Sequence, residues 1–289
     1  MHDSVRSGKK FSIIIPALNE EKLLKRLLSQ FTDELKKEYD LEVIVSDGGS
    51  RDLTKEIAKE NADRLILHTE KYSQNISQGR NEGAKNSLGD VLIFLNADTC
   101  VNNIVYFLKE VIRQFEKKNV IAIACRIEVF PEEVRFSDKL FHGFYNNYVA
   151  FLNKFLMGMG RGECQIVRRE KFFEVAGYNE KLAAGEDFDL FKRLRKLGKV
   201  KFRRDFLVYE SPRRYRKFGY TRVFRDWTKN SLSVMLFHRS VSKNWEAVRW
   251  DFGFVISDLG FWIWNFGFGI WNFGFGILDL TFLILDLFY

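Results

Sequence analysis

Short apolar runs alternate with amphipathic segments over the first 130 residues. The first run, residues 11–16, is rich in isoleucine, and the segment 20–38 after it has the apolar spacing of a helix. The alternation continues with predicted strands over 41–47, 64–68, 90–95 and 120–124 and predicted helices over 52–61, 74–87 and 103–117. Strands that alternate with helices in this way predict an α/β fold with a mainly parallel sheet covered by helices on both faces.

The pattern loosens after Pro131. An aromatic helical stretch over 136–159 precedes a predicted strand over 163–168, and a further helix is predicted to begin near Gly185. No linker rich in proline, glycine or serine interrupts the chain before residue 250. We therefore predict one catalytic domain over 1–239 and a separate tail over 240–289.

The tail has an unusual repeat. From Asp251 to the end, an aspartate or asparagine recurs every seventh residue among apolar, mostly aromatic residues. Residues 259–278 form an uncharged run of 20, which is long enough to cross a hydrocarbon core as a helix. Three interpretations remain open: a membrane anchor, a self-association segment, or an idle repeat left by tandem duplication.

Charge and cysteine content indicate the binding partners and the cellular compartment to expect. The chain has 46 basic and 38 acidic residues, and the segment 192–249 alone holds 18 Lys/Arg against 4 Asp/Glu. Such a segment favours phosphates or an anionic lipid surface, whereas no recognised nucleic-acid motif accompanies it. The three cysteines lie far apart with no CxxC pair, and residues 1–10 contain no apolar core of a cleavable signal. A reducing compartment is the expected setting.

Polar residues follow several predicted strands. Asn19, Asp47 and Asp98 all fall at the carboxyl ends of predicted strands, where parallel sheets bind their ligands. Glu186 and Asp187 come much later, at the predicted start of a helix. Acids at that position also stabilise the helix dipole, so their presence alone does not prove a catalytic role.

Several motifs in order carry a family resemblance. They read PALNEE from residue 16, SDGGS from 46, NAD from 96 and GEDFD from 185. Over about residues 10–230 the chain resembles glycosyltransferase family 2, the inverting nucleotide-sugar transferases with an A-type, Rossmann-like fold. The resemblance implies that Asp47 accepts hydrogen bonds from the nucleotide base or ribose. It implies further donor-binding roles for Pro16, Ala17, Asn19, Glu20, Arg80, Asn96, Arg213 and Arg214.

The same resemblance implies a metal site and a general base. Asn96-Ala97-Asp98 stands where the family has its Asp-x-Asp motif, so Asp98 is the predicted main protein ligand of Mn²⁺ or Mg²⁺. The asparagine at the first position departs from the family and implies that the donor diphosphate supplies much of the coordination. Glu186 and Asp187 match the family's Glu-Asp pair, in which the aspartate is the general base on the acceptor hydroxyl.

These features predict a metal-assisted glycosyltransferase that moves a hexosyl group from a nucleotide-sugar to an acceptor hydroxyl or a lipid phosphate. The basic segment followed by an apolar tail places the expected enzyme on the cytoplasmic side of a membrane. Two alternatives are a catalytically weak membrane scaffold that keeps the fold, and a sugar nucleotidyltransferase. The latter usually has a Gly-rich triphosphate loop after its first strand, which is absent here. An oxidoreductase is disfavoured because no GxGxxG follows that strand.

Overall fold

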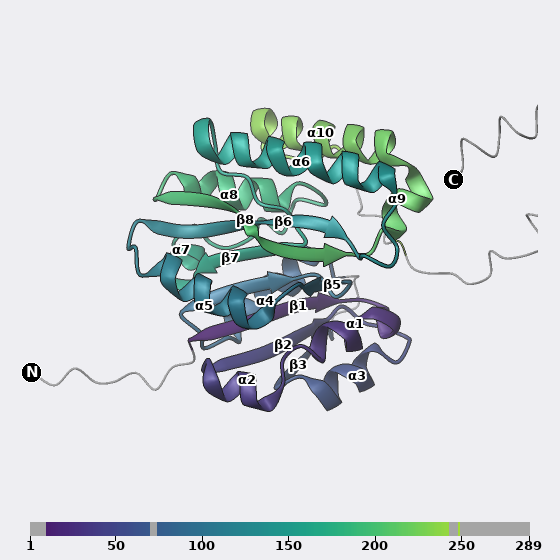
Figure 1. Cartoon of the computed structure of the whole chain (residues 1–289), viewed down its shortest axis with the longest axis vertical. Coiled ribbons are helices and arrows are strands. Elements are labelled where there is room, and N and C mark those ends of the chain that lie inside the picture. The colour runs from purple at the N-terminus through teal and green to yellow at the C-terminus, as the bar shows by residue number, and fades with distance from the viewer. Residues whose placement is uncertain (1–9, 70–73, 243–247, 249–289) are drawn as a thin grey trace, which may run out of the picture. The chain divides into compact units, whose positions relative to one another are not determined.

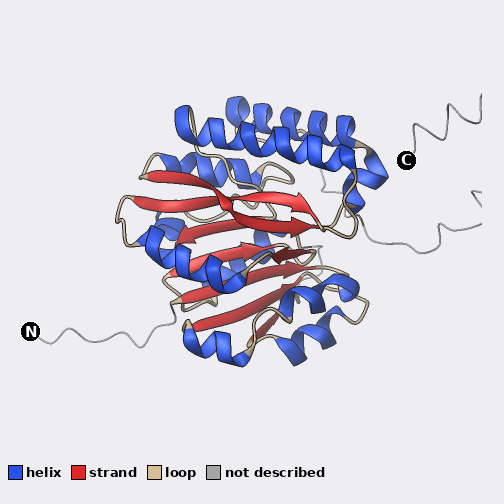
Figure 2. Cartoon of the chain, viewed as in Figure 1, coloured by secondary structure: helices blue, strands red, loops and turns tan. Residues whose placement is uncertain are grey.

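The computed structural model describes residues 10–69, 74–242 and 248 (Figure 1). Its strands form one eight-stranded sheet in the order β3-β2-β1-β4-β7-β6-β8-β5 (Figure 2). The strands are β1 (Phe11–Ala17), β2 (Leu41–Asp47), β3 (Arg64–Leu67), β4 (Val91–Leu95), β5 (Thr99–Val101), β6 (Val120–Val129), β7 (Cys164–Arg168) and β8 (Lys199–Glu210).

The predicted mainly parallel α/β fold is confirmed. β1, β2, β3 and β4 run parallel, and β6 and β8 form a further parallel pair. Antiparallel pairs join β7 to its two neighbours, and β5 pairs antiparallel with β8 at one edge. β1 and β2 pair residue for residue, which brings Ala17 opposite Asp47 at their carboxyl ends. The loops that leave these strands are therefore neighbours.

Helices cover both faces of the sheet, as predicted. They are α1 (Glu21–Leu28), α2 (Asp33–Glu38), α3 (Thr54–Asn61), α4 (Ile76–Lys85), α5 (Ile104–Phe115), α6 (Phe136–Phe155), α7 (Arg169–Glu174), α8 (Glu186–Arg195), α9 (Arg213–Phe218) and α10 (Tyr220–Phe237). Side chains from α1, α2, α3 and α5 pack with Ile13 and Ile15 of β1 on one face. Side chains from α4, α6, α7, α8 and α10 pack with Ile14 on the other. This division follows from the alternation of side chains along a strand.

Several predicted elements needed correction. The segment 20–38 is two helices rather than one, because the Thr32 hydroxyl accepts the Leu35 amide and caps a new helix. The strand that begins at Val120 continues to Val129, since it pairs with β8, a strand that the apolar pattern did not reveal. The aromatic helix ends at Phe155 rather than 159.

Most of the proposed tail, residues 243–247 and 249–289, lies outside the described residues. The anchor, self-association and idle-repeat interpretations therefore stay predictions. Within the described part of the chain, no helix has the length and apolar character that a membrane crossing requires.

Candidate active site

The predicted site residues gather at one edge of the sheet. β1, β2 and β4 end there, and α9 lies at the same edge, on the right of Figure 1. Contacts between side chains far apart in the sequence confirm the assembly, since Arg80 reaches Glu186 and Arg213 reaches Glu20. The fold thus joins segments separated by more than 100 residues into one polar cluster.

Asp47 carries an unused hydrogen-bond acceptor in this cluster. Its Oδ2 accepts the backbone amides of Gly49 and Ser50 at 2.9 and 3.0 Å, which fixes the turn after β2. Its Oδ1 is buried and receives no hydrogen bond from the residues that the structure describes. A buried acceptor without a donor is costly, so this oxygen is suited to a donor group brought by a ligand.

Asn19 shapes the loop after β1. Its backbone has a positive φ of 53°, its amide donates to the Ser50 hydroxyl at 2.8 Å, and its side-chain oxygen accepts the Arg51 amide at 2.8 Å. Asn19 therefore fastens the first loop to the second. Pro16 and Ala17 end β1, and the Ala17 carbonyl accepts the Gly48 amide at 2.9 Å. Direct donor contacts by these three residues stay predictions.

Arg80 is an internal cross-link. It is fully buried and donates to Glu186 at 3.0 Å, to the Asn96 side-chain oxygen at 3.0 Å and to the Gly162 carbonyl at 2.7 Å. Burial alone would lower its pKa, but Tyr178 and the Glu186 carboxylate outweigh burial and raise it. Arg80 thus holds α8 against the loop after β4, and the predicted nucleotide contact by its side chain stays a prediction.

Arg213 connects two of the predicted site carboxylates. Its two terminal nitrogens donate to the two carboxylate oxygens of Glu20 at 2.8 and 2.6 Å, and Nη2 also donates to Asp98 Oδ2 at 2.9 Å. Burial lowers its pKa, yet the Asp98 and Glu20 charges outweigh burial and raise it. A cation stands permanently beside Asp98. Arg214, next in sequence, is half-buried, with its guanidinium 5.8 Å from the Phe218 ring centre.

The predicted metal position offers few protein ligands. The Asn96 side-chain oxygen already accepts Arg80, and Asp98 Oδ2 accepts Arg213. Among the described residues, no group of three or more His, Cys, Asp or Glu side chains could hold a metal ion. Asp98 Oδ1 receives no hydrogen bond from this part of the chain. These residues could offer a hard cation one oxygen of Asp98, so a cation here would need its other ligands from the donor diphosphate.

Asp187 has the properties of a general base. It is half-buried at the start of α8, and the Phe188 amide donates to its Oδ1 at 2.8 Å. Burial, followed by the charge of neighbouring Glu186, raises the pKa of Asp187 to about 7. Gly185 enters the helix with φ of 80°, a conformation that favours glycine. A carboxylate with a pKa near 7 suits proton abstraction at neutral pH.

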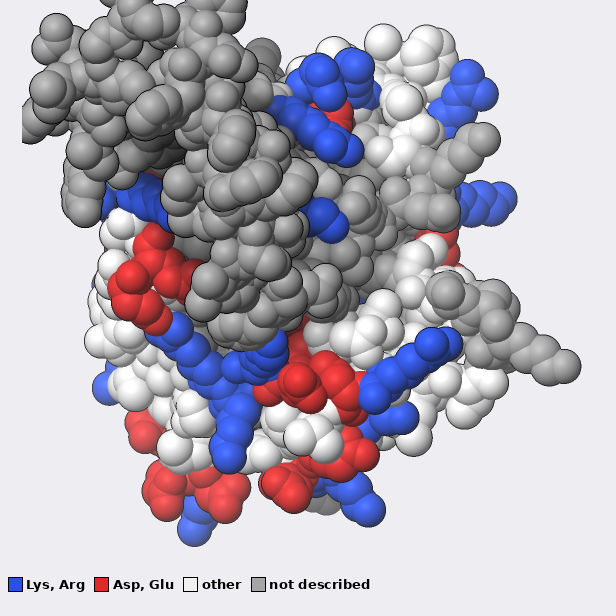
Figure 3. All heavy atoms as spheres, turned by 90° about the vertical axis from the view of Figure 1, so that its right-hand side faces the viewer, with Lys and Arg blue, Asp and Glu red and all other residues white. Residues whose placement is uncertain are grey.

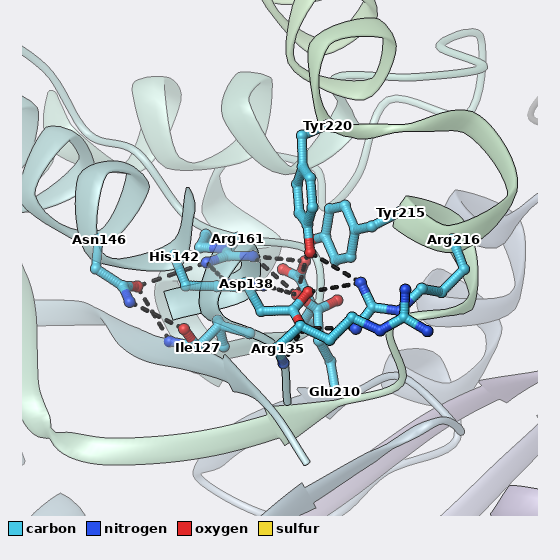
Figure 4. A network of polar contacts seen from close by, with 11 residues as sticks. Ile127, Arg135, Asp138, His142, Asn146, Arg161, Glu210, Tyr215, Arg216 and Tyr220 are labelled. Atoms are coloured by element: carbon cyan, nitrogen blue, oxygen red, sulfur yellow. Dashed lines mark hydrogen bonds and ion pairs between the residues drawn. The ribbon is translucent and has the colours of Figure 1, made fainter. Parts of the chain in front are cut away.

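A buried network beside the site was missed by sequence reasoning (Figure 4). Fully buried Arg161 donates to Glu163 at 3.0 Å and to Glu210 at 3.1 Å, and the Tyr215 hydroxyl donates to Glu210 at 2.8 Å. Burial and the Glu163 charge raise the pKa of Glu210, and burial lowers that of His142 to about 3. The GRGECQ loop from residue 160 was the available signal, but Glu210, the partner of Arg161 on β8, lies 49 residues further on.

The network also holds α9 in place. Arg216 of α9 donates to Asp138 at the start of α6 at 2.9 Å, and it donates to the Tyr220 hydroxyl at 3.1 Å. Tyr215, on the same short helix, bonds to Glu210 at the end of β8. α9 carries Arg213, so these contacts set the position of the guanidinium that faces Asp98.

Comparisons with known proteins identify the family to which the chain belongs. The family model described as glycosyl transferase family 2 matches residues 12–175. A 4,4'-diaponeurosporenoate glycosyltransferase of Staphylococcus haemolyticus is 33% identical over 123 residues, which cover 40% of this chain and 32% of the relative. The chain spans about a third or less of the length of such curated relatives.

Two solved structures share the fold. The mannosyltransferase PcManGT from Pyrobaculum calidifontis, in complex with GDP-Man and Mn²⁺, matches 77% of this chain and 61% of its own, with a TM-score of 0.60 and 19% identity. The S. aureus TarS 1-349 complex with UDP-GlcNAc matches 70% of this chain and 58% of its own, with a TM-score of 0.53 and 19% identity. With the family match covering more than half of the sequence, the chain belongs to glycosyl transferase family 2.

Proposed function

We propose that the chain transfers a sugar from a nucleoside-diphosphate donor to an acceptor hydroxyl or a lipid phosphate, with inversion at the anomeric carbon. The raised pKa and the position of Asp187 carry the proposal. It is a half-buried carboxylate with a pKa of about 7 at the sheet edge where the donor-site residues meet. A single such base is sufficient for an inverting displacement, because no covalent intermediate needs a second carboxylate.

In this proposal the nucleoside is held between the first two loops. Asp47 Oδ1 accepts an N–H of the base or a ribose hydroxyl and so gains the hydrogen bond that no described residue gives it. Arg214 faces the diphosphate, whose oxygens an arginine fork can bind in bidentate fashion, and Arg213, already paired with Glu20 and Asp98, adds a positive charge beside it. A divalent cation beside Asp98 would neutralise part of the charge on the departing nucleoside diphosphate. The neighbouring structures with GDP-Man and Mn²⁺ and with UDP-GlcNAc support this class of ligands.

In the acceptor step Asp187 removes the proton of the attacking hydroxyl, for which a half-buried position beside the donor is suited. A lipid-linked acceptor on the cytoplasmic side of a membrane forms part of the proposal. Its support is the basic segment 192–249, with 18 basic against 4 acidic residues.

A matched pair of variants separates donor binding from chemistry. Asp47→Asn keeps an oxygen for the Gly49 and Ser50 amides but turns an N–H₂ toward the ligand, so donor affinity should fall by about tenfold or more in calorimetry. Asp187→Asn should bind the donor nearly normally and transfer roughly 10² to 10⁴ times more slowly. A screen of nucleotide-sugars would identify the donor to be used in both measurements. Transfer at the wild-type rate by Asp187→Asn would contradict the proposed role of the base and favour a different reaction.

A further inference from the structure

An apolar stripe runs along the outward face of α6. Its members recur every three or four residues and expose between 41% and 76% of their surface: Phe136, Leu140, Phe144, Tyr148, Phe151 and Phe155. This spacing places them on one side of the helix. Isolated exposed apolar residues are ordinary, but a continuous aromatic stripe marks an interaction surface.

Helix α10 widens this stripe. It lies beside α6 in the outermost layer of the fold (Figures 1 and 2), and the rings of Phe144 and Phe224 are 5.8 Å apart. Leu232, Leu236 and Phe237 of α10 are also exposed. We call these exposed side chains of the two helices the α6/α10 face.

The charges around the α6/α10 face are mostly positive. The exposed bases of the two helices and of the residue before α6 are Arg135, Lys139, Lys154, Arg222, Arg225 and Lys229. The helices carry two acids: Asp138 is buried against Arg216, and Asp226 lies near Arg222 and Arg225. In the described part of the top of Figure 3, Lys and Arg side chains outnumber the acidic ones and stand beside uncharged residues.

We infer that the α6/α10 face docks onto an anionic lipid bilayer. An aromatic and aliphatic stripe bordered by lysine and arginine is the composition of helices that lie in the membrane interface. A second copy of the chain is a poorer occupant, because it would bring the same bases against one another. The Asp138–Arg216 pair ties the start of α6 to α9, so the docked face adjoins the helix that carries Arg213.

This inference is independent of residues 249–289 and of the proposed chemistry, and vesicle sedimentation without donor tests it. Full-length protein should bind vesicles of phosphatidylcholine mixed with phosphatidylglycerol and bind pure phosphatidylcholine more weakly. Phe151→Ser with Phe155→Ser should lower the partition coefficient by about tenfold, since both rings are more than half exposed. Lys139→Glu with Lys154→Glu should lower it by about tenfold on anionic vesicles.

Matched controls change equivalent residues elsewhere on the surface. Leu53→Ser with Leu88→Ser removes two exposed apolar side chains, and Lys109→Glu with Lys118→Glu reverses two exposed bases outside the face. These variants should bind as the wild type does. If the α6 variants bind vesicles as the wild type does, the inference is overturned and another segment binds the membrane. It is also overturned if ultracentrifugation shows a dimer that only the Phe151/Phe155 variant dissociates, while that variant still binds vesicles.

Discussion

The raised pKa of Asp187 predicts two linked pH dependences. Below pH 7 an increasing fraction of Asp187 carries a proton and cannot accept one from the acceptor. At pH 6, one unit below the pKa of about 7, about a tenth of the molecules hold an ionised Asp187. The value of kcat/KM should therefore fall about tenfold between the plateau above pH 8 and pH 6. A transferase assay with saturating metal and a series of buffers at constant ionic strength measures this limb.

The free energy of unfolding should change with pH in the opposite direction to the activity. The folded chain binds a proton at Asp187 that the unfolded chain, with an aspartate pKa near 3.8, releases, so unfolding free energy falls as pH rises from 4 to 7. A pKa difference of about three corresponds to about 4 kcal/mol. Asp187→Asn removes the charge that burial penalises, so it should be more stable than wild type by up to about that amount at pH 8 and similar at pH 4.

Urea denaturation of wild type and Asp187→Asn at both pH values tests the linkage. Asp189→Asn serves as the matched control, because it changes an aspartate on the same helix that pairs with Arg193. The Asp189→Asn variant should keep the fall in kcat/KM between pH 8 and pH 6. A flat activity profile from pH 5.5 to 8, or a stability difference between wild type and Asp187→Asn that does not change with pH, would refute the reasoning.

Three further predictions concern the metal position, the buried network and the core. Asp98→Ala should abolish the thermal shift produced by manganese with a nucleoside diphosphate, and an undiminished shift would place the metal elsewhere. Arg161→Met should lower the free energy of unfolding by about 3–5 kcal/mol, measured by urea denaturation, because two buried carboxylates lose their cation. The control Arg113→Met, whose side chain is 69% exposed, should lower it by less than about 1 kcal/mol. Gly83→Val should cost about 1–3 kcal/mol because a Cβ at Gly83 would stand 2.4 Å from Ile14. Gly143→Ala, with open space around it, should cost nothing measurable in the same experiment.

The candidate site was predictable where short motifs sit at strand ends. Asp47 ends one predicted strand and Asp98 lies in the loop after another, so the topology of a parallel sheet was enough to bring them to one edge. The partners of Arg80 could not be predicted in this way. Its contacts with Glu186 and Asn96 cross 106 and 16 residues and depend on how α4 and α8 pack.

The sequence by itself determined the parallel half of the sheet, because strands β1, β2 and β4 are continuous apolar runs whose burial requires helices on both sides. Strand β8, with bases at Lys199, Lys201 and Arg203, has no continuous apolar run, and its pairing with β6 and β5 places it in the sheet. The tertiary structure alone also decided which charges meet. Arg213 faces Glu20 and Asp98 across 193 and 115 residues, since ion pairing depends on distance in space and leaves no periodic signal in the chain.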